Sequence, residues 1–197
     1  APWTLIIYLY NLKNKNNPNK KIKIENKKEI KLIFKKLEEF LKLHIIHQKN
    51  AGADIIQIFD SWAGLIKEEN LDEYCFTPNK NLVNFCKDNK IPVICFPKGL
   101  KENYKKFLDK VKPDAINIDQ EIDPVWVKNN LNEVCIQGGM NPKLLLRSEK
   151  EILEETDRYL DIFKNNPYIF NLGHGILPET NPDIIKKIVD KVNLVAR

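Results

Sequence analysis

Short apolar runs alternate with amphipathic helical patterns along most of this chain, and this alternation restricts the possible folds more than any single motif does. The run at 168–172 is rich in aromatic and β-branched residues and stops at Gly173, a pattern typical of a buried strand. Strands that alternate with helices in this way predict an α/β fold with a parallel sheet. We expect about five strands, at 54–59, 92–96, 114–118, 133–136 and 168–172.

The helices between these runs are predicted from apolar residues at three-to-four spacing and from capping signals. Residues 29–49 place lysines and glutamates opposite an apolar stripe. Ser148 and Glu151 form a capping box that opens a later helix, and Thr180 or Asn181 caps the last one. Further helices are expected at about 78–89, at about 101–111 and around 125–127.

The first 28 residues are less regular than the rest. Residues 1–10 are interpreted as a loop that runs into a helix, with Thr4 near the cap. Residues 11–28 consist mostly of Asn and Lys and contain Pro18, which predicts a solvated loop.

A polar residue follows each predicted strand. Because the carboxyl ends of parallel strands meet at one edge or face of a sheet, we expect these side chains to gather there and form a site. Helix capping alone explains an Asp or a Ser at such positions, but not Lys, Gln and His together. The residues are Ser61, Lys98, Asp119, Gln137 and His174.

The spacing of the strands favours a (β/α) barrel over a nucleotide-binding fold. No strand is followed by a Gly-x-Gly-x-x-Gly or Gly-x-x-x-x-Gly-Lys-[Ser/Thr] loop. About five strands make up only part of an eight-stranded barrel. We therefore predict one partial (β/α)8 TIM-barrel domain over residues 1–197.

Composition narrows the function classes. The chain is 43% hydrophobic and 30% charged, which is typical of a globular protein, and no apolar run has the length of a membrane span. The net charge of +5 comes from scattered lysines, so we expect no nucleic-acid partner. Cys75, Cys86, Cys95 and Cys135 form no Cys-x-x-Cys pair, and His44 and His47 have no third ligand nearby. We expect reduced thiols, a cytoplasmic location and no metal site.

Several segments together resemble the uroporphyrinogen decarboxylase family, over the whole length of the chain. The Asn171-Leu172-Gly173-His174-Gly175 run and the run from Gln57 to Trp62 are the most specific of them. Asp119 falls where the family has Leu-Asp-Trp, but here it is followed by Gln120. The run that begins at Gln137 reads Gln-Gly-Gly-Met-Asn-Pro in place of the family's Gln-Gly-Asn-Leu-Asp-Pro, so we expect altered loop shapes. The other matching segments are Ala1–Leu5 with Tyr8, Gly52–Asp54 and Gln137-Gly138.

The resemblance implies a cytoplasmic homodimer that decarboxylates the acetate side chains of uroporphyrinogen III to give coproporphyrinogen III, without metal or organic cofactor. Tyr8, Ser61 and His174 match family positions that contact the substrate, and Asp119, Gln137 and Asn171 match supporting positions. The family's Arg-rich segment and its catalytic aspartate belong upstream of Ala1, so no catalytic residue of the family is expected within this chain. The sequence also opens without an initiating Met. We expect that the chain begins inside a longer protein or was processed, and that alone it is inactive and poorly soluble.

Two alternatives remain. One is a cofactor-methylating relative on the same barrel, which needs a His-x-Cys zinc pair near the last strands; His174 is followed by Gly-Ile instead. The other is a non-catalytic product of a split or decaying gene, which acts at most as an interaction partner. An intact upstream coding segment in frame argues against that second alternative.

Overall fold

In the computed structural model, which describes residues 1–13, 17, 21 and 26–195, five strands follow one another in the order β1-β2-β3-β4-β5. β1 (Ile56–Asp60) pairs in parallel with β2 (Val93–Pro97). β3 is Ala115–Ile118, and β4 (Cys135–Gly138) pairs in parallel with β5 (Tyr168–Ile169). These strands and the helices between them confirm the predicted α/β class, and the sequential strand order is that of part of a (β/α)8 barrel.

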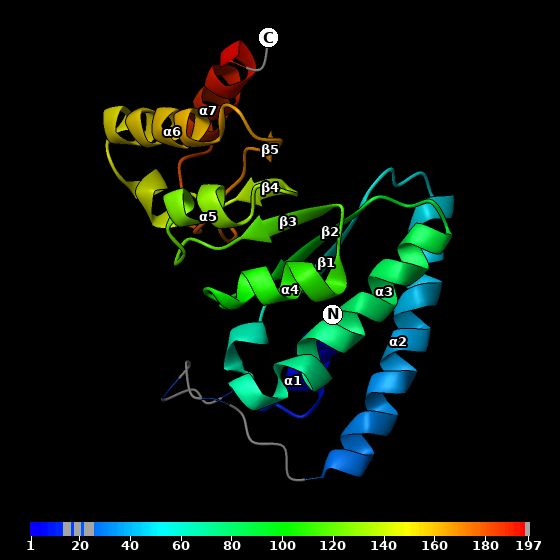
Figure 1. The fold of residues 1–197 in the computed structure, drawn as a ribbon. Coiled ribbons are helices and arrows are strands. Elements are labelled where there is room, and N and C mark those ends of the chain that lie inside the picture. Colours follow the sequence, from blue (N-terminus) through cyan, green and yellow to red (C-terminus); the bar gives the residue numbers. More distant parts are fainter. Residues whose placement is uncertain (14–16, 18–20, 22–25, 196–197) are drawn as a thin grey trace. The chain divides into compact units, whose positions relative to one another are not determined.

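Contacts divide the chain into two units, Ala1–Ala115 and Ile116–Arg197. Figure 1 shows that α2 and α3 of the first unit run alongside each other, and in the second unit α6 and α7 are in contact. The prediction of one partial barrel domain stays a prediction. The helices of the first unit are α1 (Pro2–Leu9), α2 (Lys27–Asn50), α3 (Thr77–Asp88) and α4 (Asn103–Val111). Those of the second unit are α5 (Pro124–Asn130), α6 (Glu149–Phe163) and α7 (Pro182–Val195), with a 3₁₀ turn, η4 (Pro142–Leu146).

The first unit is built around a stack of aromatic rings. Tyr74 lies between Trp3 of α1 and Phe34 of α2, with ring centroids 5.7 Å and 5.6 Å away and nearly parallel planes. All three side chains are buried. Such contacts add to the hydrophobic stabilisation from burial, so the stack fixes α1 and α2 on the same core.

Helix α6 follows the sequence prediction closely. Ser148 and Glu151 form the expected capping box, and the stripe that faces inward carries Ile152, Tyr159 and Phe163, all buried. Leu160, which we placed on the same stripe, is half-buried.

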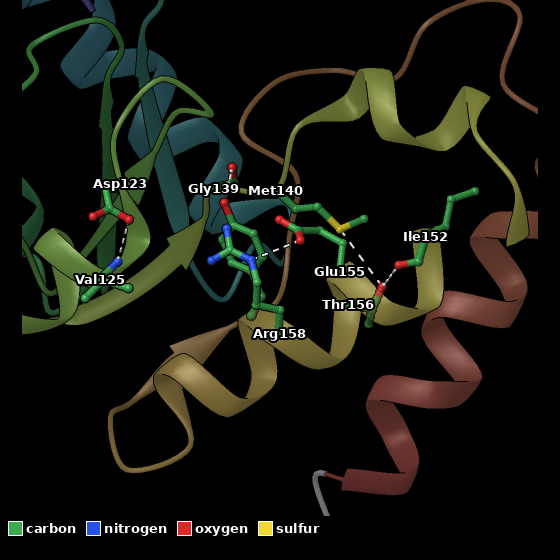
Figure 2. A network of polar contacts seen from close by, with 9 residues as sticks. Asp123, Val125, Gly139, Met140, Ile152, Glu155, Thr156 and Arg158 are labelled. Carbon is green, nitrogen blue, oxygen red and sulfur yellow. Dashed lines mark hydrogen bonds and ion pairs between the residues drawn. The ribbon is translucent and has the colours of Figure 1, made fainter. Parts of the chain in front are cut away.

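A network of polar contacts surrounds the middle of α6 (Figure 2). Thr156 donates its hydroxyl hydrogen bond to the carbonyl of Ile152, 2.9 Å away and one turn earlier in the helix. On another side of the helix, the Arg158 Nε lies 3.0 Å from a carboxylate oxygen of Glu155. In the same view, Asp123 caps α5 by accepting the amide of Val125 at 3.1 Å.

The expected role of Thr4 is wrong. Helix α1 begins at Pro2 with Ala1 as its N-cap residue, so Thr4 lies in the first turn and its side chain does not cap the helix. Proline suits the first position of a helix, because its fixed φ is helical and its missing N–H needs no partner there. The hydroxyl of Thr4 instead binds a buried carboxylate, as described below for the site.

The last strand is shorter than predicted. β5 covers Tyr168–Ile169 only, and pairing resumes as a single bridge between Met140 and Leu172. Gly138 and Gly139 have φ values of +85° and +102°, which interrupt the extended backbone of the partner strand. The ladder therefore breaks at these glycines.

Between β1 and α3 the chain makes three short helical turns that the sequence pattern does not reveal. Two are 3₁₀ turns, η1 (Ala63–Leu65) and η2 (Glu68–Asn70), and the third, η3 (Asp72–Phe76), is a π-helical turn. Turns this short show no usable apolar period. η3 is nevertheless important, because it places Tyr74 in the aromatic stack.

Other expectations are tested only in part. Most of the predicted loop at 11–28 lies outside the described residues, and α2 already begins at Lys27, with Asn26 as its cap. All four cysteines are free thiols, three of them buried and Cys135 half-exposed. Within the described ranges, no helix has the length and apolar character needed to cross a membrane.

Candidate functional site

Tyr8 and Ser61, both predicted to contact substrate, belong to the first unit. Tyr8 lies in the last turn of α1 and is 64% exposed. Ser61 follows β1 directly and is half-buried. The residue next to it, Trp62, meets the Tyr8 ring edge-on, with centroids 6.5 Å apart. Tyr8 therefore contacts the residue that directly follows Ser61.

Positive charge lies close to this pair. The Lys13 ammonium is 4.2 Å from the centroid of the Trp62 ring, a cation–π contact. Lys98 follows β2, the strand next to β1, and its amide donates a hydrogen bond to the Asp60 carbonyl at 3.2 Å. Tyrosine and serine hydroxyls and lysine ammonium groups are donors that suit the binding of carboxylates.

Two glycines allow the loops after β1 and β2 to touch. A Cβ on Gly64 would lie 3.0 Å from the Cα of Gly99, a contact tighter than real Cβ atoms normally make. The Gly64 amide also donates to the Lys98 carbonyl at 2.8 Å. The segments that carry Ser61 and Lys98 are thus fixed against each other by backbone contacts.

A buried carboxyl group lies directly before Ser61, at the end of β1. Asp60 is fully buried, and its two oxygens accept hydrogen bonds from the Thr4 hydroxyl at 2.9 Å and the Asn79 side-chain amide at 3.0 Å. Burial raises the pKa of the Asp60 carboxyl, and these hydrogen bonds act in the opposite direction. Burial likewise raises the pKa of the Cys75 thiol beside it well above its usual value.

In the second unit, Asp119 and Gln137 are buried and bonded to their surroundings. The Asp119 carboxylate accepts the amide of Glu121 at 2.9 Å, which shapes the turn after β3. Gln137 of β4 donates its side-chain amide to the Asn117 side chain of β3 at 2.6 Å. These contacts suit residues that hold the strand ends together.

Gly139 stands where the family pattern has Asn, and two tyrosines contact the backbone at this point. The Tyr159 hydroxyl of α6 donates to the Gly139 carbonyl at 2.8 Å, and the Tyr168 hydroxyl of β5 donates to the Gly138 carbonyl at 2.9 Å. A side chain on Gly139 would collide with Tyr159 and Ile118, each 2.9 Å from the added Cβ. The loop after β4 is therefore held by two tyrosine hydroxyls and by tight packing against Ile118 and Tyr159.

His174 stands exposed on the loop after β5. Its Nδ1 accepts the Gly175 amide at 2.7 Å. Asn171 is exposed as well, and its side-chain oxygen accepts the Leu172 amide at 2.8 Å. An exposed imidazole ring is suited to binding a carboxylate or to proton transfer.

At Gly173 the loop after β5 packs closely against the backbone of the turn after β3. A Cβ built on Gly173 would overlap the Gln120 amide nitrogen and would lie 2.8 Å from the Asp119 carbonyl carbon. Glycine is required here by contact with neighbouring backbone, which has no flexible end to move aside. Asp119 and His174, two of the predicted residues, are therefore held in adjacent loops.

Sequence reasoning missed the group formed by Thr4, Asp60 and Asn79. The signal present was an Asp at the end of β1, directly before Ser61, but its partners lie 56 residues before it and 19 residues after it. Within the part of the chain that the structure describes, no group of three His, Cys, Asp or Glu side chains is placed to hold a metal ion.

Comparison with known proteins gives a consistent picture. The family model described as uroporphyrinogen decarboxylase matches residues 1–194. A uroporphyrinogen decarboxylase of Rickettsia bellii is 40% identical over 193 residues, which cover 96% of this chain and 57% of the relative. Those of Rickettsia felis and Orientia tsutsugamushi are 36% and 38% identical, over 98% and 96% of this chain. The chain thus spans 57% to 58% of the length of these relatives.

Proposed function

Because the chain belongs to the uroporphyrinogen decarboxylase family, we propose that it forms part of an enzyme that removes the acetate carboxyl groups of uroporphyrinogen III and yields coproporphyrinogen III. The match of the family model across residues 1–194 carries this proposal. The substrate is a small tetrapyrrole, and the reaction is that of a carboxy-lyase.

We propose that Tyr8, Ser61 and His174 contact this substrate. Each offers a polar hydrogen outside the buried core, and a substrate with many carboxylates needs such donors. The Lys13 ammonium lies over the ring of Trp62, the residue after Ser61, and adds positive charge there. This cation favours the approach of a polyanion.

Asp119, Gln137 and Asn171 have supporting roles in this proposal. The first two are buried and engaged with neighbouring groups, which fits residues that shape the loops. Asn171 orders the backbone three residues before His174. Substitution of these residues then acts on the site through the position of the loops.

Loss of CO2 from an acetate on a pyrrole becomes easier once the ring is protonated, because the ring then accepts the electron pair of the breaking bond. The enzyme has to supply a proton and stabilise the charge on the ring. In this proposal the catalytic aspartate and the Arg-rich segment come from outside residues 1–197, and no metal or organic cofactor takes part. We further propose a cytoplasmic homodimer.

The test joins this chain to the N-terminal part of the Rickettsia bellii relative, the part that the chain does not match. The joined protein and the chain alone are incubated with uroporphyrinogen III, and the products are oxidised and separated by chromatography. We expect coproporphyrin from the joined protein and none from the chain alone. Circular dichroism and gel filtration confirm that the joined protein is folded.

The joined protein with His174→Ala tests the proposed substrate contact. We expect at least about a tenfold lower rate, because this contact is lost. A folded joined protein without activity contradicts the proposed function and favours the non-catalytic alternative. Activity of the isolated chain contradicts only the assignment of the catalytic groups to a segment outside it.

A further inference from the structure

Asp60 is the last residue of β1, and Ser61 begins the turn that follows the strand. The Asp60 side chain is fully buried, whereas Ser61 is half-buried. Asp60 therefore has no direct access to a substrate bound by Ser61. Any effect on the site must pass through the residues that Asp60 holds.

Three contacts connect α1 to the segment 60–62. The Thr4 hydroxyl donates to Asp60 at 2.9 Å, the Trp3 indole N–H donates to the Trp62 carbonyl at 2.9 Å, and the Tyr8 ring meets the Trp62 ring. Thr4 and Tyr8 are four residues apart, so they lie one above the other on the same side of the helix. The end of β1 is thus tied to the helix side that carries Tyr8.

The second oxygen of Asp60 is held from another element. Asn79 of α3 donates to it at 3.0 Å and to the Cys75 carbonyl at 2.8 Å. Thr4, Asp60 and Asn79 are all at most 9% exposed, so these hydrogen bonds do not compete with water. Asp60 is the point at which α1, β1 and α3 are joined by polar contacts.

We propose that Asp60 is a positioning residue, which fixes the distance between Tyr8 and Ser61 by holding Thr4 of α1 and Asn79 of α3. An apolar residue fills a buried position at lower cost than a carboxyl group, which needs all its partners. What the carboxyl group adds is a directional bond to each of two helices, to α1 through Thr4 and to α3 through Asn79. This inference rests on the proposed function of Tyr8 and Ser61 as substrate contacts.

The test uses Thr4→Val, which keeps the shape of the side chain and removes the donor to Asp60. The variant is made in the native gene and assayed as the purified native protein with uroporphyrinogen III. We expect kcat/KM to fall about five- to tenfold, mainly through a higher KM, because Tyr8 and Ser61 bind substrate both before and during the reaction. Thr4→Ser, which restores a hydroxyl, is expected to recover most of this loss.

Thr156→Val is the matched control. Thr156 is also a buried threonine, but its hydroxyl binds the Ile152 carbonyl inside α6, and we expect kcat/KM of this variant to equal that of the wild type. Urea unfolding of each variant separates lost stability from lost positioning. Wild-type kinetics in a stably folded Thr4→Val overturn the positioning role alone. Absence of decarboxylation in the wild type instead overturns the function on which the inference rests.

Discussion

The two glycines beside His174 differ in the space around them. A Cβ on Gly173 would overlap the backbone of Gln120, whereas a Cβ on Gly175 would meet no atom within 4 Å. We expect Gly173→Ala to lower the free energy of unfolding by about 1–3 kcal/mol, since neighbouring backbone has to move. Gly175→Ala, the control, is expected to change it by less than about 0.5 kcal/mol. Urea titration measures both, and equal effects would contradict the steric explanation.

The four cysteine thiols differ in how deeply they are buried, and this difference affects their reactivity. Burial raises the pKa of Cys86 to about 11 and also raises the pKa of Cys75 and Cys95, and these three side chains are buried. Cys135 is half-exposed, and burial raises its pKa as well. Because the thiolate is the reactive form, we expect iodoacetamide at pH 8 to label Cys135 first. Peptide mass spectrometry identifies the labelled site, and in denaturant all four should react.

At the scale of elements, Tyr159 connects α6 to the loop after β4. Burial raises its pKa to about 12, and its hydroxyl donates to the Gly139 carbonyl. A folded-state pKa above the unfolded value of about 10 means that the folded state keeps its proton longer. This contribution to stability is complete below about pH 10 and is lost as the pH rises through 12.

The test is Tyr159→Phe, which removes the titrating group and leaves the Gly139 carbonyl without its tyrosine donor. We expect a loss of about 1–2 kcal/mol at pH 8, measured by urea unfolding. Between pH 10 and 12 the stability of the variant should decline less steeply than that of the wild type. Parallel declines would show that Tyr159 does not titrate in that range.

Elements with their own local signals could be predicted from the sequence, and those that depend on distant partners could not. The capping box at Ser148 and Glu151 lies within four residues and was predicted correctly. The early break in β5 depends on the left-handed conformation of Gly138 and Gly139, 30 residues before it in the chain, which no pattern near Tyr168 reveals.

In the candidate site, too, residues within local motifs could be predicted, and contacts between distant residues could not. Motifs in the sequence pointed to Tyr8, Ser61 and His174, whose roles stay predictions. The hydrogen bond from Thr4 to Asp60 was not predicted, because it joins residues 56 positions apart and Thr4 carries a plausible capping signal of its own. The tight approach of Gly173 to Gln120 was hidden for the same reason, since it depends on how two loops pack.

At the scale of the whole molecule, both units expose large apolar side chains. In the first unit Phe59 of β1 is 52% exposed and Leu43 of α2 is 62% exposed; in the second, Ile176 is 57% exposed. Exposed apolar groups bind hydrophobic dyes and promote self-association unless another surface covers them. We therefore expect the isolated chain to enhance the fluorescence of anilinonaphthalene sulfonate and to associate at micromolar concentrations.

The same surfaces give a test of how the chain is completed. The N-terminal part of the Rickettsia bellii relative, supplied as a separate polypeptide, should lower the dye fluorescence and raise the melting temperature of the chain, because a partner that binds only the folded state stabilises it. Serum albumin at equal concentration is the control for non-specific coverage. If the relative's segment has no more effect than albumin, these apolar side chains are not the surface that the rest of such a protein covers. Saturation at one segment per chain would identify them as part of an interface between the two portions of a barrel.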